Sequence, residues 1–89
     1  MKYTFRFTER ARRDLRGIDQ PGAMRILAAL TRLGDDPYRA DAEIKKLTDQ
    51  HGIYRLRVGD FRVAYTVDDG QLIILVIKIG NRRDIYRNL

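Results

Sequence analysis

The second half of the chain is the part of the sequence that most restricts the fold. From Ile53 onward polar and apolar residues alternate with a period of two, and two turn sequences, Gly59-Asp60 and Asp69-Gly70, interrupt the alternation. Strands show this period because successive side chains point to opposite faces of a sheet, and such dipeptides join antiparallel neighbours. The sequence therefore predicts three antiparallel strands, over about residues 53–58, 61–67 and 72–79.

The first residues predict one strand followed by a short helix. Residues 2–7 alternate, which places three aromatic side chains on one face, namely Tyr3, Phe5 and Phe7. Thr8 can cap a helix that runs to about Gly17, because its hydroxyl can accept a hydrogen bond from an N–H group of the first turn. The several arginines of this helix are interpreted as a solvent-exposed face.

A second helix is predicted from an apolar stripe with spacings of three and four. Pro21 suits its first turn, with Asp19 or Gln20 as the cap, and the stripe consists of Ala23, Ile26, Leu27, Leu30 and Leu33. The sequence Gly34 to Pro37 ends the helix. Residues 38–50 are polar apart from two apolar residues, so we expect a loop with at most one turn of helix there.

Length and composition favour a single basic domain over residues 1–89. The chain has 89 residues, a net charge of +6 and no cysteine, which excludes disulfides and thiolate-bound metals. Serine is absent and His51 is the only histidine, in a segment where a surface position is the ordinary interpretation. The longest apolar run has six residues, too short for a membrane span, so we expect a cytoplasmic protein. The sequence has no metal-binding or nucleotide-binding motif, so we expect no cofactor and no metal.

The turn at Gly59-Asp60 fixes which residues face each other in the first hairpin. It sets Arg57 opposite Arg62, so that Arg55, Arg57 and Arg62 share one face of the sheet. The other face is apolar and is expected to seat the helices, through Tyr54, Leu56, Val58, Phe61, Val63 and Tyr65.

Two interpretations of the arginine face are open. Alternating arginines are often a solvated surface, yet like charges directly across a strand pair are destabilising, so folding alone gives no reason for Arg57 opposite Arg62. Clustered guanidinium groups beside an aromatic ring would instead suit a phosphodiester and its base. Extending the register sets Arg62 opposite Ile77 and brings Arg82, Arg83 and Tyr86 to the rim. It also places an apolar patch on that face, from Ile73, Leu75, Ile77 and Ile79, which is expected to bind a protein partner.

These residues resemble those of a known family. The segments YRLRVGDFRVAY (Tyr54 to Tyr65) and VIKIGNRRDIYR (Val76 to Arg87), with the opening FTERARRDL, resemble the RelE-type toxins of the RelE/ParE superfamily. The resemblance covers nearly the whole chain. It implies an α+β fold in which two N-terminal helices pack on one face of an antiparallel sheet and a short C-terminal helix follows.

The resemblance also implies an activity and a partner. RelE-type toxins are metal-independent endoribonucleases that cut messenger RNA in the A site of the 30S ribosomal subunit, and an acidic, amphipathic RelB-like antitoxin holds them inactive. The family's catalytic residues fall on Arg55, Arg57, Arg62, Arg82 and Tyr86. Further RNA contacts are expected from Lys45, Lys46, Lys78 and Arg83. The general base stays open, because Arg55 and Arg57 stand where the best-known relatives carry lysine.

Two alternatives come from other functional classes. A ParE-like toxin would inhibit DNA gyrase by binding and would need no catalytic residues. An inactive relative would keep the basic face only to bind RNA. The family's arginine and tyrosine near the C-terminus, matched here by Arg82 and Tyr86, favour the nuclease.

Overall fold

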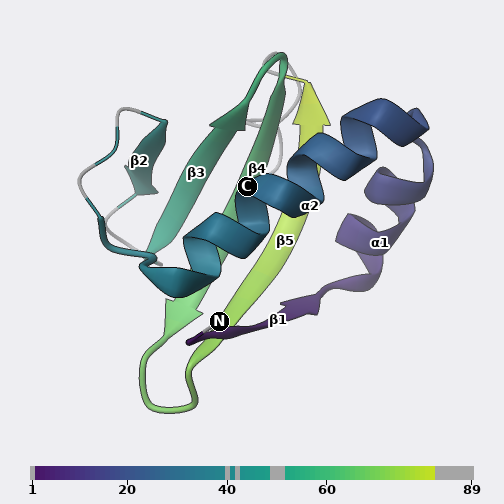
Figure 1. Cartoon of the computed structure of the whole chain (residues 1–89). Coiled ribbons are helices and arrows are strands. Elements are labelled where there is room, and N and C mark those ends of the chain that lie inside the picture. The colour runs from purple at the N-terminus through teal and green to yellow at the C-terminus, as the bar shows by residue number, and fades with distance from the viewer. Residues whose placement is uncertain (1, 40, 42, 49–51, 82–89) are drawn as a thin grey trace.

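The computed structural model describes residues 2–39, 41, 43–48 and 52–81, which form one mixed sheet with helices on one side (Figure 1). The strand order is β1-β5-β4-β3-β2. In chain order the elements are β1 (Thr4–Phe7), α1 (Glu9–Arg16), α2 (Gln20–Asp35), β2 (Ile44–Thr48), β3 (Ile53–Val58), β4 (Phe61–Asp68) and β5 (Ile73–Asn81). The predicted C-terminal helix would lie within residues 82–89, outside the described residues.

The sequence suggested a wholly antiparallel sheet, and this prediction is wrong for one pair of strands. β1 pairs with β5 in parallel, from Thr4 opposite Ile73 to Phe7 opposite Val76, whereas the other neighbours are antiparallel. The reason is the route of the chain. The two helices carry it from β1 to the far edge of the sheet, and the meander then returns strand by strand until β5 lies beside β1.

Both helices begin at the caps that the sequence predicts. The Thr8 hydroxyl accepts from the backbone N–H of Ala11 at 3.1 Å, and a carboxylate oxygen of Asp19 accepts from that of Gly22 at 3.3 Å. The Thr8 hydroxyl also donates to the carbonyl of Ile77 at 2.7 Å, so the cap of α1 is joined directly to β5.

The expected loop over residues 38–50 is wrong, because it contains the edge strand β2. Ile44 pairs with Leu56 and Lys45 with Arg55, and the register shifts between Lys46 and Thr48. The two lysines hide the strand pattern in the sequence. They suit an edge strand, whose unpaired side must resist pairing with other chains.

The main core lies between the helices and the sheet. It is built from aromatic and aliphatic side chains, namely Tyr3, Ala11, Ile26, Ala29, Leu30, Leu33, Leu56, Val63, Tyr65, Ile74, Val76 and Ile79. Tyr54 stacks on Tyr65 with ring centroids 5.7 Å apart. A smaller cluster on the opposite face joins Ile53 and Ala64, with Leu47 and Ile77 packed against it.

A register shift in β5 corrects the second half of the predicted pairing. Tyr65 pairs with Val76 but Ala64 pairs with Lys78, so Ile77 is an extra residue in β5. Such a bulge changes which face the following residues occupy. Arg62 therefore lies opposite Gly80, not Ile77, and Ile79 is buried in the helix-side core rather than beside the arginines.

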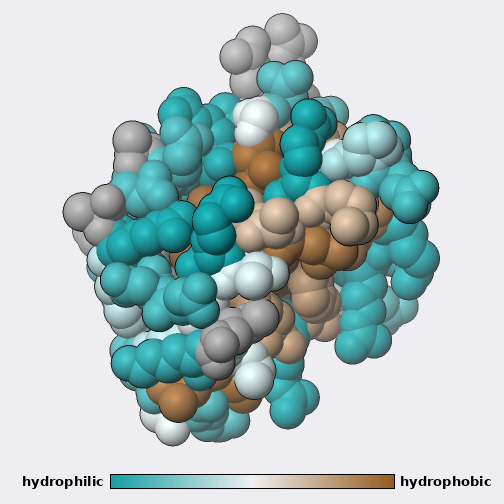
Figure 2. Space-filling view, in the orientation of Figure 1, coloured by the Kyte–Doolittle hydropathy of each residue, from teal (hydrophilic) through white to brown (hydrophobic). Residues whose placement is uncertain are grey.

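The predicted apolar patch on the arginine face is thereby reduced. Ile73, Leu75 and Ile77 are half-buried there, and Ile79 is absent from it. Among the residues that the structure describes, Met24 on α2 is the most exposed large apolar side chain, at 59%, and Figure 2 shows a band of hydrophobic surface over this helix. Among the described residues no helix has the length and apolar character needed to cross a membrane.

Candidate functional site

The face of the sheet opposite the helices carries two rows of basic side chains. The hairpin between β3 and β4 has the predicted register, with Arg57 opposite Arg62 and Arg55 opposite Ala64. β2 extends the row that contains Arg55, because Lys45 pairs with Arg55. Since paired residues point to the same side of a sheet, Lys45, Arg55, Arg57 and Arg62 share this face. We call these four residues the basic face.

Glu43, immediately before β2, forms an ion pair with one arginine of the basic face. Arg57 donates from Nε and from a terminal nitrogen to the two carboxylate oxygens, at 2.7 and 2.6 Å. The backbone N–H of Arg57 also donates to the carbonyl of Glu43 at 2.8 Å. These bonds hold the carboxylate in a bidentate fork, the geometry in which arginine also binds phosphate.

The charges of the three arginines all act on Glu43. Its pKa lies below the ordinary value because of the hydrogen bonds from Arg57, with further lowering by the charges of Arg57, Arg55 and Arg62. The same contact raises the pKa of Arg57. One carboxylate therefore lies in the field of all three guanidinium groups.

The other two arginines have different surroundings. Arg62 donates to the backbone carbonyls of Gly59 and Phe61, at 2.8 and 2.9 Å, which orients its side chain without neutralising it. Gly59 has a φ of 59° in this turn, a left-handed conformation that suits glycine. Arg55 is half-buried, and its Nε has no hydrogen-bond partner among the residues that the structure describes.

The other predicted site residues differ in position. Lys46 pairs with Tyr54, so it faces the helix side of the sheet. Lys78 pairs with Ala64, which lies opposite Arg55, so the register puts it in the same row as Arg55, where it is only 5% exposed and also lines a groove between α1 and β5. Arg82, Arg83 and Tyr86 lie outside the described residues, so their roles stay predictions, as does any role for His51.

A groove lies between α1 and the end of β5. Its cavity volume is about 440 Å³, and its lining includes Arg10, Arg13, Lys78 and Asn81. Asp14 closes one side, where it accepts the backbone N–H of Ile79 at 3.0 Å and pairs with Arg10 at 3.1 Å. The groove thus brings cations from α1 beside the end of β5, together with the carboxylates of Asp14 and Asp19.

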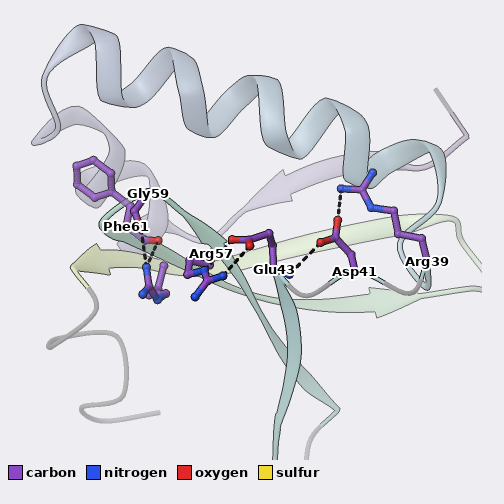
Figure 3. A network of polar contacts seen from close by, with 7 residues as sticks. Arg39, Asp41, Glu43, Arg57, Gly59 and Phe61 are labelled. Atoms are coloured by element: carbon purple, nitrogen blue, oxygen red, sulfur yellow. Dashed lines mark hydrogen bonds and ion pairs between the residues drawn. The ribbon is translucent and has the colours of Figure 1, made fainter.

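Sequence reasoning missed the acidic residues of this site. Arg39 pairs with Asp41 at 3.0 Å, Asp41 accepts the backbone N–H of Glu43 at 2.9 Å, and Glu43 holds Arg57, as Figure 3 shows. Recognising β2 would have revealed Glu43, because it then falls beside Arg57 in the same row. Among the described residues, no group of three or more His, Cys, Asp or Glu side chains could hold a metal ion.

Comparison with known proteins gives consistent matches along nearly the whole chain. A sequence model described as the ParE toxin of the type II toxin–antitoxin system parDE matches residues 5–86. Toxin RelG of Mycobacterium tuberculosis is 34% identical, with 98% of this chain and 99% of that protein covered. Toxin RelE of the same organism is 31% identical, with 96% and 87% covered.

Solved structures agree on the fold. The archaeal RelE–RelB complex from Pyrococcus horikoshii matches with a TM-score of 0.78 at 26% identity, covering 92% of this chain and 97% of that one. The intact RelBE toxin–antitoxin complex of E. coli matches with a TM-score of 0.74 at 27% identity, covering 89% and 95%.

Proposed function

This chain belongs to the RelE/ParE superfamily of type II toxins, and we propose that it is a ribosome-dependent endoribonuclease that cleaves messenger RNA in the cytoplasm. The observation that carries the proposal is the register of β2, β3 and β4. It gathers Lys45, Arg55, Arg57 and Arg62 on the helix-free face, where Glu43 is the acidic residue paired with them among the described side chains.

The chemistry of the basic face suits cleavage of a phosphodiester without a metal. Attack of a ribose 2′-hydroxyl on the adjacent phosphate gives a 2′,3′-cyclic phosphate and releases the 5′-oxygen of the next nucleotide. Negative charge develops on the phosphate oxygens in the transition state, and fixed cations stabilise it. Arg55 and Arg62 are proposed for this role, because neither is paired with a carboxylate in the described structure.

The proton of the 2′-hydroxyl needs a separate acceptor. A guanidinium has a pKa above about 12 and stays protonated, so Arg55 and Arg57 are poor general bases. In the proposal Arg82 lies near the leaving oxygen and Tyr86 stacks on a base, following the family resemblance.

The proposed protein partner is a RelB-like antitoxin. The matching structures from Pyrococcus horikoshii and E. coli are complexes of a RelE toxin with RelB. An acidic segment would neutralise the basic face, and its apolar residues could cover Leu75 and Ile77 beside that face. Co-purification with the product of the neighbouring reading frame tests this pairing.

The nuclease proposal is tested by primer extension on a messenger RNA translated in vitro with the purified protein. We expect cuts within A-site codons. Arg62→Ala should lower the cleavage rate by about 100-fold, in the range found when one transition-state donor is removed. Arg25→Ala is the matched control, because Arg25 is an exposed arginine on α2, on the other side of the sheet. Equal rates for the two variants would contradict the proposal.

A ParE-like activity is the second candidate, favoured by the match of residues 5–86 to the ParE toxin family. It predicts inhibition of purified DNA gyrase in a supercoiling assay. Gyrase inhibition with intact messenger RNA would replace the nuclease proposal by this one.

A further inference from the structure

Glu43 forms an ion pair with Arg57, one of the arginines that the proposed function assigns to RNA. Its two carboxylate oxygens take both donor positions of the Arg57 fork, and they lie in the field of Arg55 and Arg62. A carboxylate in this position has the charge and the bidentate geometry of two phosphate oxygens. A phosphodiester that binds Arg57 through the same fork must therefore displace Glu43.

The position of Glu43 is built into the fold rather than left to a mobile side chain. Its backbone N–H donates to Asp41, whose carboxylate is in turn held by Arg39 (Figure 3). Its carbonyl accepts the N–H of Arg57, which continues the pairing of the chain before β2 with β3. The backbone of Glu43 thus stays beside Arg57 whenever the sheet is formed, which keeps its carboxylate within reach of the guanidinium.

We propose that Glu43 is a built-in competitor that binds Arg57 in place of an RNA phosphate and lowers the affinity of the free toxin for RNA. The inference rests on the proposed function, because it concerns the same face. The ion pair is accessible to RNA, since the side chains of Glu43 and Arg57 are 42% and 43% exposed. Exposed ion pairs are weak, so a phosphate can displace the carboxylate when other contacts hold the RNA.

The competitor would weaken every RNA complex that uses the Arg57 fork. The loss is small, about 1.5- to 5-fold in affinity, because the ion pair is exposed. RNA held along the whole face offsets this loss through the contacts of Lys45, Arg55 and Arg62.

Removal of the carboxylate should tighten RNA binding. Glu43→Gln is expected to lower the Kd for a single-stranded RNA by about 1.5- to 5-fold, the range that corresponds to an exposed ion pair. The dependence of log K on log salt should steepen by about 0.7, because one more cation becomes available to the phosphates. Fluorescence anisotropy measures both quantities, with an RNA whose 2′-hydroxyls are replaced by hydrogen at the cleavage positions.

Two further variants separate this local effect from a change in net charge. Glu9→Gln removes the same charge from an exposed position in the first turn of α1 and should leave the Kd within experimental error. Glu43→Asp keeps the net charge but shortens the side chain by one methylene, which weakens its contact with the two nitrogens of the fork. It should tighten binding by an intermediate amount.

The outcomes distinguish the inference from the function on which it rests. Equal affinities for Glu43→Gln and Glu9→Gln, or weaker binding by Glu43→Gln, would overturn the role of Glu43. A fall in the cleavage rate of Glu43→Gln at saturating messenger RNA would also overturn it, because Glu43 would then take part in the reaction. If Arg62→Ala binds and cleaves RNA as the parent protein does, the proposed function itself fails.

Discussion

The hydroxyl of Thr8 makes two bonds whose removal can be predicted in detail. It accepts the N–H of Ala11 at 3.1 Å and donates to the carbonyl of Ile77 at 2.7 Å. Ile77 is the extra residue of β5, so the second bond attaches the start of α1 to the bulge that sets Arg62 opposite Gly80. Thr8→Val keeps the branched shape of the side chain and removes both bonds.

The expected loss of stability follows from the two bonds. Loss of an N-cap costs about 1 kcal/mol. The carbonyl of Ile77 loses its side-chain donor in a partly buried position, which costs about 1 kcal/mol more. We therefore expect Thr8→Val to lower the free energy of unfolding by about 2 kcal/mol, or the Tm by about 8–16 °C in a domain of this size.

Urea unfolding followed by circular dichroism measures this loss. The midpoint should fall with no change in the m-value, because the surface exposed on unfolding stays the same. Thr31→Val is the matched control. The hydroxyl of Thr31 is exposed and donates to the carbonyl of Leu27 within α2 at 2.9 Å, so the free energy should change by less than about 0.5 kcal/mol.

Two results would refute this reasoning. Equal losses for Thr8→Val and Thr31→Val would mean that the bonds to Ala11 and Ile77 add nothing to stability. Thr8→Ser keeps the hydroxyl and should retain most of the stability. A loss in Thr8→Ser as large as in Thr8→Val would assign the effect to the methyl group.

Two further predictions concern other contacts of the fold. Gly22→Ala should lower the free energy of unfolding by about 1–3 kcal/mol in urea titrations, because its Cβ would lie 2.9 Å from Ile18 and 3.1 Å from Phe61. A Cβ at Gly17 would meet no atom closer than 3.5 Å, so Gly17→Ala should not destabilise the protein. A larger loss of stability in Gly17→Ala than in Gly22→Ala would contradict this account of the packing. The hydroxyls of Tyr3 and Tyr38 donate to Asp69 and lower its pKa in the folded protein. The stability that Asp69 adds is therefore fully present above the unfolded pKa of about 3.9, and it is lost as the pH falls through the lower folded pKa. Asp69→Asn should therefore lower the Tm at pH 7 but differ less from the parent protein in acid, and a constant difference at every pH would count against this linkage.

Local sequence was sufficient for the elements whose signals lie within a few residues. The cap at Thr8, the cap at Asp19, which was one of two candidates, and the register of the first hairpin are confirmed. The apolar stripe of α2 is confirmed for Ile26, Leu30 and Leu33, whereas Leu27 is exposed. Each depends on a side chain and its near neighbours, or on a turn of two residues that fixes the pairing of both strands. The sequence alone thus placed Arg55, Arg57 and Arg62 on one face.

Contacts between distant segments decided the rest. The parallel pairing of β1 with β5 and the edge strand β2 exist only because β5 and β3 offer free edges at those places. The extra residue Ile77 packs on the smaller core cluster and accepts the bond from Thr8, and a period-two pattern contains neither contact. Because of these distant contacts Ile79 lies in the core, Lys45 lies beside Arg55, and Glu43 forms an ion pair with Arg57. The sequence therefore determined that cations gather on one face, and the tertiary structure determined which of them are neutralised and by what, because hydrogen bonds between strands depend on which edges meet.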